Sequence, residues 1–198
     1  FNMDDDLEEH CVLCGENYDS GCFRAAALIN ESDWTDEIHD TCPESIKTSW
    51  NNVIDFVMNS SDEDFKANIE NYFDLQSLLD YHIYGLYMCG IDQYGKNQIY
   101  MTYDGIKWIA SMYDMDSTWG SYWDGTREVS SAYRMQEDYE TGVNGTSNLL
   151  YDRLEEQKIK KPFYYLVVYD SDKYNGTPSN IAAKKMFDAA GVVCQPYH

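Results

Sequence analysis

Apolar residues recur at helical spacing in two segments of the first half of the chain. The first segment follows Pro43, a residue that suits the first position of a helix. Its apolar positions are Ile46, Trp50, Val53 and Val57. The second follows Asp74, which can cap a helix. Its apolar positions are Leu75, Leu78, Leu79, Ile83 and Leu86. Between these two predicted helices, Ser61 to Asp64 is typical of the capped start of a short helix.

The pattern changes to β-branched and aromatic residues after Asn97. Gln98 to Tyr103, Asp104-Gly105 and Ile106 to Met112 predict a β-hairpin, because Asp-Gly between such segments is the strongest short-range hairpin signal. A further strand is expected over Cys22 to Ile29, and a further helix over Leu149 to Glu156. The elements together predict an α+β fold.

Two acidic loops border the predicted hairpin. The first contains Asp92 and Asn97, and the second contains Asp114 and Asp116, followed by Gly120. Carboxylate and amide oxygens are the ligands that Mg²⁺ prefers in proteins. The catalytic core of a protein kinase has the same order of elements: a helix, an Asp-x4-Asn loop, a hairpin and a second acidic loop.

From about Asp62 to Glu156 the chain resembles the CotH kinase family, the atypical kinases of spore-coat type. The matching blocks are Phe73-Asp74-Leu75 with Leu79-Asp80-Tyr81, Asp92-x-Tyr94-x-x-Asn97, Tyr113-Asp114-x-Asp116-x-x-Trp119-Gly120, and Asn148-Leu149-Leu150-Tyr151-x-Arg153-Leu154. The resemblance implies a divergent protein-kinase-like fold that transfers phosphate from ATP to Ser or Thr of a surface or coat protein, with Mg²⁺ as cofactor.

The resemblance also assigns roles by position. Asp92 is expected to be the catalytic acid of the first loop, with Asn97 as a metal ligand and Asp114 or Asp116 as the metal-binding Asp. We favour Asp114 as the direct ligand, because it ends the predicted strand, and Asp116 as an additional ligand or a brace. Asn97 and one of the two Asp residues are expected to converge on one ion.

Parts of a kinase nucleotide site are absent from the sequence. It contains no Gly-x-Gly-x-x-Gly loop, and the only basic residues before Asp92 are Arg24, Lys47 and Lys66. We therefore expect residues 1–156 to form a partial, N-terminally truncated kinase-like domain that binds Mg²⁺-ATP weakly. Residues 157–198 are expected to form a divergent β-α-β-like tail.

Two other functions stay open on the sequence alone. Asp114-x-Asp116-x-Thr118 after an apolar strand also resembles the nucleophile motif of haloacid-dehalogenase-type phosphatases, in which Asp114 would attack phosphate. A non-catalytic attachment module of a virion, coat or cell surface, binding glycan or protein through aromatic loops, is the other alternative.

Charge restricts the partners. The net charge of −21 argues against nucleic acid and anionic membranes, and no apolar run is long enough to span a bilayer. The sequence does not identify the compartment, and an extracellular surface, spore coat or virion is the expected location.

Four cysteines gather near the start of the chain, together with two histidines. They are Cys11, Cys14, Cys22 and Cys42, with His10 and His39. Their irregular spacing leaves open a zinc site, a disulfide or buried thiols.

Overall fold

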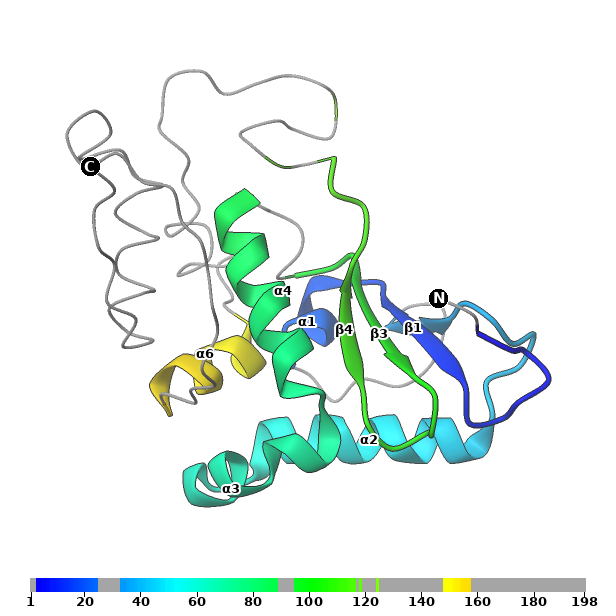
Figure 1. Ribbon diagram of the computed structural model, residues 1–198, viewed down its shortest axis with the longest axis horizontal. Helices are drawn as coiled ribbons and strands as arrows, with labels where there is room; N and C mark the ends of the chain where they lie inside the picture. The colour runs from blue at the N-terminus through cyan, green and yellow to red at the C-terminus, as the bar shows by residue number, and fades with distance from the viewer. Residues whose placement is uncertain are drawn as a thin grey trace.

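The computed structural model describes residues 3–24, 33–88, 95–116, 118, 124 and 148–157, and all structural statements below concern these residues. The elements are β1 (Cys11–Gly15), α1 (Tyr18–Gly21), β2 (Trp34–Asp36), α2 (Glu44–Asn59), α3 (Asp62–Tyr72), α4 (Leu75–Met88), β3 (Gln98–Thr102), β4 (Ile109–Met112) and α6 (Leu149–Glu156) (Figure 1). Helices and an antiparallel sheet confirm the α+β class. No helix in the described ranges has the length and apolar content of a membrane span.

The strands form one four-stranded sheet in the order β2-β1-β3-β4. All neighbouring strands are antiparallel, so β1 lies between β2 and the hairpin. The sequence did not predict β1 or β2. It predicted a strand over Cys22 to Ile29 instead, which is wrong for Cys22 and Phe23, since these residues form the turn after α1. The backbone of Phe23 is left-handed there, with φ of 53°. Residues 25–29 of that prediction lie outside the described residues.

The predicted hairpin is confirmed, but its turn is longer than two residues. Pairing ends at Met101 and Ile109, so β4 begins later than the predicted Ile106. Asp104 closes the turn, since its Oδ1 accepts hydrogen bonds from the backbone N–H groups of Ile106 and Lys107, both at 2.8 Å. Partial burial would raise the pKa of Asp104, but these hydrogen bonds outweigh it and lower the pKa.

The predicted helices form where their capping residues indicate. Ser61 caps α3 by accepting from the N–H of Asp64 at 3.1 Å, and Asp74 caps α4 by accepting from the N–H of Ser77 at 2.8 Å. The first long helix begins at Glu44, one residue later than predicted, and Pro43 occupies its N-cap position.

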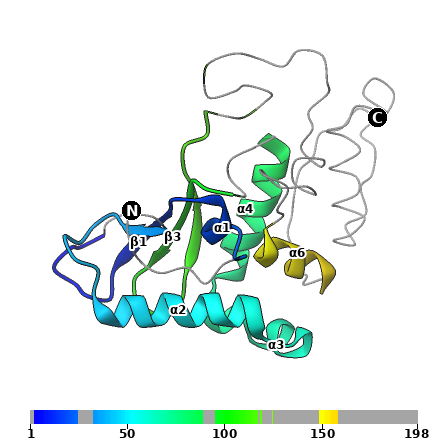
Figure 2. The same ribbon diagram turned by 180° about the vertical axis from the view of Figure 1, so that it is seen from behind.

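The core lies between α2 and the sheet. Trp50 of α2 has its ring centroid 4.8 Å from that of Trp34, 5.1 Å from that of Tyr100 and 4.7 Å from that of Trp108. Such aromatic contacts add to the large apolar area that each ring removes from water. In Figures 1 and 2, α2 runs across one end of the sheet.

The start of α4 is fixed to the edge of the sheet. The N–H of Asp74 donates to the carbonyl of Trp108 at 2.8 Å, and the hydroxyl of Ser77 accepts from the N–H of Ala110 at 3.0 Å. Because of these bonds α4 runs beside β4 (Figure 1). The edge strand that leads to Asp114 is thereby held against a helix.

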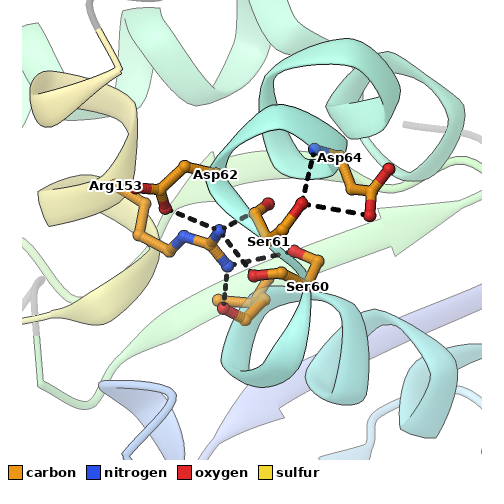
Figure 3. Close-up of polar contacts among 6 residues, drawn as sticks. Ser60, Ser61, Asp62, Asp64 and Arg153 are labelled. Carbon is orange, nitrogen blue, oxygen red and sulfur yellow. Dashed lines mark hydrogen bonds and ion pairs between the residues drawn. The ribbon is translucent and has the colours of Figure 1, made fainter.

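A buried arginine joins α6 to the end of α2. The guanidinium of Arg153 donates to the carbonyl oxygens of Val57 at 2.7 Å, Ser60 at 2.9 Å and Ser61 at 3.0 Å. It also lies 3.2 Å from a carboxylate oxygen of Asp62 (Figure 3). The last carbonyl groups of a helix have no partner inside the helix, and the guanidinium of Arg153 supplies a hydrogen-bond donor where α2 ends and α3 begins.

Candidate metal and catalytic site

The two acidic loops meet at the open end of the hairpin. Asn97 directly precedes β3 and Asp114 follows β4, and pairing of Gln98 with Met112 brings these chain ends together. The side-chain amide Nδ2 of Asn97 donates to Oδ2 of Asp114 at 3.0 Å. The side chains of Asn97 and Asp114 are therefore in contact, and their binding of one common ion stays a prediction.

Both residues of this pair have a left-handed backbone. The φ angle is 56° at Asn97 and 48° at Asp114. This region is uncommon for residues other than Gly, although Asn and Asp tolerate it best, and strain of this kind gathers at functional sites. Asn and Asp at these two positions are thus suited to the backbone conformation that the ends of the hairpin require.

The structure gives less information about the other two predicted site residues, Asp116 and Asp92. Asp116 is exposed, in the turn after Asp114, and within the described part of the chain no hydrogen bond joins it to Asn97. The turn is closed by the hydroxyl of Thr118, which donates to the carbonyl of Met115 at 2.8 Å. Asp92 lies outside the described residues.

Glu16 and Glu37, which follow β1 and β2, lie with Cys14 of β1. Burial, followed by the charges of Glu16, Glu37 and Asp114, raises the pKa of Cys14 to about 11. The three carboxylates therefore act on one region of the molecule. Such a concentration of negative charge favours a divalent cation.

The loop before Asn97 rests closely on α1. A Cβ atom added to Gly95 would lie 2.0 Å from Cδ1 of Tyr18, and one added to Gly21 would lie 1.9 Å from the carbonyl oxygen of Gly95. The N–H of Asn97 also donates to the carbonyl of Gly15 at 3.3 Å. The backbone leading into the site is therefore held by α1 and β1.

A buried polar network lies behind this loop, and sequence reasoning did not identify it as such. Gln98 donates from Nε2 to the carbonyl of Gly21 at 2.7 Å, and Asn148 donates to the same oxygen at 3.0 Å. The hydroxyl of Tyr100 donates to Oε1 of Gln98 at 3.0 Å. Asn148 also caps α6 by accepting from the N–H of Leu150 at 3.1 Å, which gives this residue of the matching block a structural role.

The N-terminal cysteines do not share one site. All four are buried and free of disulfides. Cys14 lies with two glutamates, whereas Cys11 lies with Asp36 and His39. Cys22 follows α1, where burial raises its pKa to about 12. A zinc site using all four cysteines is therefore not formed in the described part of the chain.

Among the described histidines, His10 and His82 have packing contacts. The ring of His10 lies 5.2 Å from that of Tyr103, and its Nδ1 accepts from the N–H of Asp4 at 3.0 Å. The ring of His82 on α4 stacks at 5.1 Å on that of Tyr151 of α6. His82 is buried and is therefore packed between α4 and α6.

The chain was compared with families of known proteins. The family model described as CotH kinase protein matches residues 18–170, which include both acidic loops, the hairpin and α6. Among curated proteins, no match to the chain was found. Because the family match covers most of the sequence, the chain belongs to the CotH kinase family.

Proposed function

We propose that this chain is a metal-dependent phosphotransferase that transfers phosphate from Mg²⁺-ATP to Ser or Thr of a protein. The observation that carries the proposal is the contact between Asn97 and Asp114 across the open end of the hairpin. It lies inside the region that matches the family and joins the two loops that a kinase uses to hold metal.

The chemistry of the pair fits Mg²⁺. Asp114 offers carboxylate oxygens, and rotation of the Asn97 amide about its last side-chain bond would present Oδ1 in place of Nδ2. Both are hard oxygen ligands, and the exposed carboxylate of Asp116 lies close by in the chain. Mg²⁺-ATP, when bound, would supply the phosphoryl group and neutralise part of its charge.

The residues would act mainly by positioning. Asp114 and Asn97 would hold the metal and its phosphates in place, with Asp116 as a further ligand or a brace. Asp92 would orient the substrate hydroxyl and accept its proton. Phosphoryl transfer requires little more than correct placement and charge stabilisation, so these few groups account for the chemistry.

The high negative charge restricts the substrate. A net charge of −21 opposes binding of nucleic acid, which favours a protein as the acceptor of phosphate. The location at an extracellular surface, spore coat or virion remains a proposal based on family resemblance.

The contact also weighs against the phosphatase-type alternative. That alternative gives Asp114 the role of nucleophile and requires nothing of Asn97. The amide of Asn97 nevertheless donates to Asp114 at 3.0 Å, and the backbone of both residues is left-handed. The kinase-like assignment gives Asn97 a role beside Asp114, because its amide would turn Oδ1 toward an ion that Asp114 also binds.

Transfer of phosphate from γ-labelled ATP tests the proposal. The 198-residue chain is incubated with Mg²⁺, ATP and a generic Ser/Thr substrate such as casein. We expect weak labelling of Ser or Thr that requires Mg²⁺ and falls at least about 100-fold in Asp92→Asn and in Asp114→Asn.

Asp55→Asn is the matched control, since it removes the same charge from the exposed face of α2. It should leave labelling unchanged. Labelling that persists in both site variants, or no Mg²⁺-dependent binding of ATP at millimolar concentration, would contradict the proposal. If Asp116→Asn abolished labelling and Asp114→Asn did not, their roles would be reversed.

A further inference from the structure

A second group of metal-ligating side chains lies at the β2 end of the sheet, outside the site described above. It consists of Cys11 of β1, Asp36 of β2 and His39, which follows β2, and Cys42 lies further along the same segment, before α2. Leu13 pairs with Asp36, so Cys11 lies diagonally across the same face of the two strands from Asp36. The fold thus brings together residues from two strands and from the segment before α2.

The side chains are close and almost completely shielded from water. One ligand atom from each of Cys11, Asp36 and His39 lies within 4.8 Å of the others. Cys11 is 0% exposed, and the side chains of Asp36 and His39 are 3% and 9% exposed. The thiol of Cys42 is also buried, and its interaction with the Cys11 thiol contributes to raising the pKa of Cys11.

Asp36 holds the histidine in one orientation. Its Oδ2 lies 2.8 Å from Nδ1 of His39, while its Oδ1 accepts from the N–H groups of Ile38 at 3.0 Å and His39 at 3.3 Å. A carboxylate that fixes one ring nitrogen is the usual companion of a metal-binding histidine.

The second nitrogen of the ring is the independent indication of a ligand. Nε2 of His39 is buried and has no hydrogen-bond partner among the described residues. Burial of an unpaired imidazole nitrogen is unfavourable, and most buried polar atoms of proteins are paired. An ion that binds here would relieve this cost.

We propose that Cys11, His39 and Cys42, together with Asp36, form a zinc site. Two sulfur ligands and an imidazole select zinc over Mg²⁺ or Ca²⁺, which prefer oxygen. Cys11, Cys42 and Nε2 of His39 would be the protein ligands, Asp36 would hold the imidazole through Nδ1, and a water molecule would complete a tetrahedral site. The ion would link β1 to the segment between β2 and α2. The proposal does not depend on the kinase-like function.

The first test is zinc uptake by the reduced chain after chelator treatment. We expect one zinc ion per chain, and a rise of about 5 °C or more in Tm when zinc is restored. Co²⁺ in place of zinc should give the thiolate charge-transfer band and the intense visible bands of tetrahedral cobalt.

Variants assign the ligands. Cys11→Ser and His39→Gln should each weaken zinc binding at least about 100-fold, and Asp36→Asn about 10-fold or more. Cys22→Ser removes a buried thiol outside the group and serves as the control, with unchanged affinity. Cys11→Ser removes a fully buried thiol and can therefore also affect folding. His39→Gln is for this reason the deciding variant, and circular dichroism compares its fold with that of the parent chain.

Two results would overturn the proposal. One is that the reduced chain takes up no zinc, or that His39→Gln binds zinc as tightly as the parent chain does. The other is a disulfide between Cys11 and Cys42 in the purified chain, shown by peptide mass spectrometry, with no zinc uptake after reduction.

Discussion

Arg153→Ala is expected to lower the free energy of unfolding by about 3 kcal/mol or more. The guanidinium is buried and donates to three carbonyl oxygens at the end of α2, of Val57, Ser60 and Ser61. Removing it would leave these oxygens without their partner and open a cavity beside the ring of Phe65, which lies 4.2 Å from the guanidinium carbon. Urea unfolding followed by tryptophan fluorescence measures the effect.

Arg24→Ala is the matched control. Arg24 also bonds to α6, through Asp152 at 2.6 Å, but its side chain is 35% exposed. An exposed pair contributes at most about 1 kcal/mol, so this variant should be much less destabilised. Arg153→Lys should fall between the two, because an ammonium group cannot reproduce the planar fork of donors. Equal effects of Arg153→Ala and Arg24→Ala would contradict the account of this corner.

Gly21→Ala is expected to disturb both stability and the candidate site. The new Cβ would lie 1.9 Å from the carbonyl oxygen and 2.9 Å from the carbonyl carbon of Gly95. These are backbone atoms and cannot rotate away, so α1 or the loop before Asn97 must move. We expect a loss of about 2 kcal/mol in stability and a lower Mg²⁺ affinity.

Gly15→Ala provides the comparison for this change. Its Cβ would lie 3.2 Å from Cζ3 of the Trp34 side chain and 3.7 Å from the carbonyl oxygen of Gln98. A side chain can yield by a few tenths of an ångström, so the effect should be smaller. Urea unfolding measures the loss of stability in Gly21→Ala and Gly15→Ala, and calorimetry measures their Mg²⁺ affinity. Wild-type behaviour of Gly21→Ala would show that the close approach to Gly95 does not position the site.

The elements that the sequence predicted correctly are those with local signals. The apolar spacing of α2, the caps at Ser61 and Asp74, and the Asp104-Gly105 turn all lie within short stretches of chain. β1 and β2 are short, and β1 reads Cys-Val-Leu-Cys-Gly with no clear alternation. Their pairing joins distant parts of the chain, which local patterns do not reveal.

The candidate site also has one part that local sequence predicts and another part that it does not. Asn97 and Asp114 could be predicted to meet because they flank a single hairpin. The network of Gln98, Gly21 and Asn148 depends on α6 lying against α1, and no local pattern indicates that contact. The cysteine–histidine group similarly requires the pairing of β1 with β2. The role of Asp92 and the nature of residues 157–198 stay predictions, because they lie outside the described residues, apart from Gln157.

The most direct test of the central claim, that Asn97 and Asp114 share a metal ion, is paramagnetic broadening by Mn²⁺ in place of Mg²⁺. The signal is the side-chain amide of Asn97 in ¹⁵N-labelled protein, assigned by its loss in Asn97→Asp. The amide of Asn59 is the internal control, because it also donates to a carboxylate, that of Asp55 at 2.8 Å, but lies on α2. We predict that Mn²⁺ broadens the Asn97 amide well before that of Asn59, and that Asp114→Asn abolishes the difference. Equal broadening of the two amides, or an unaffected Asn97, would contradict the account.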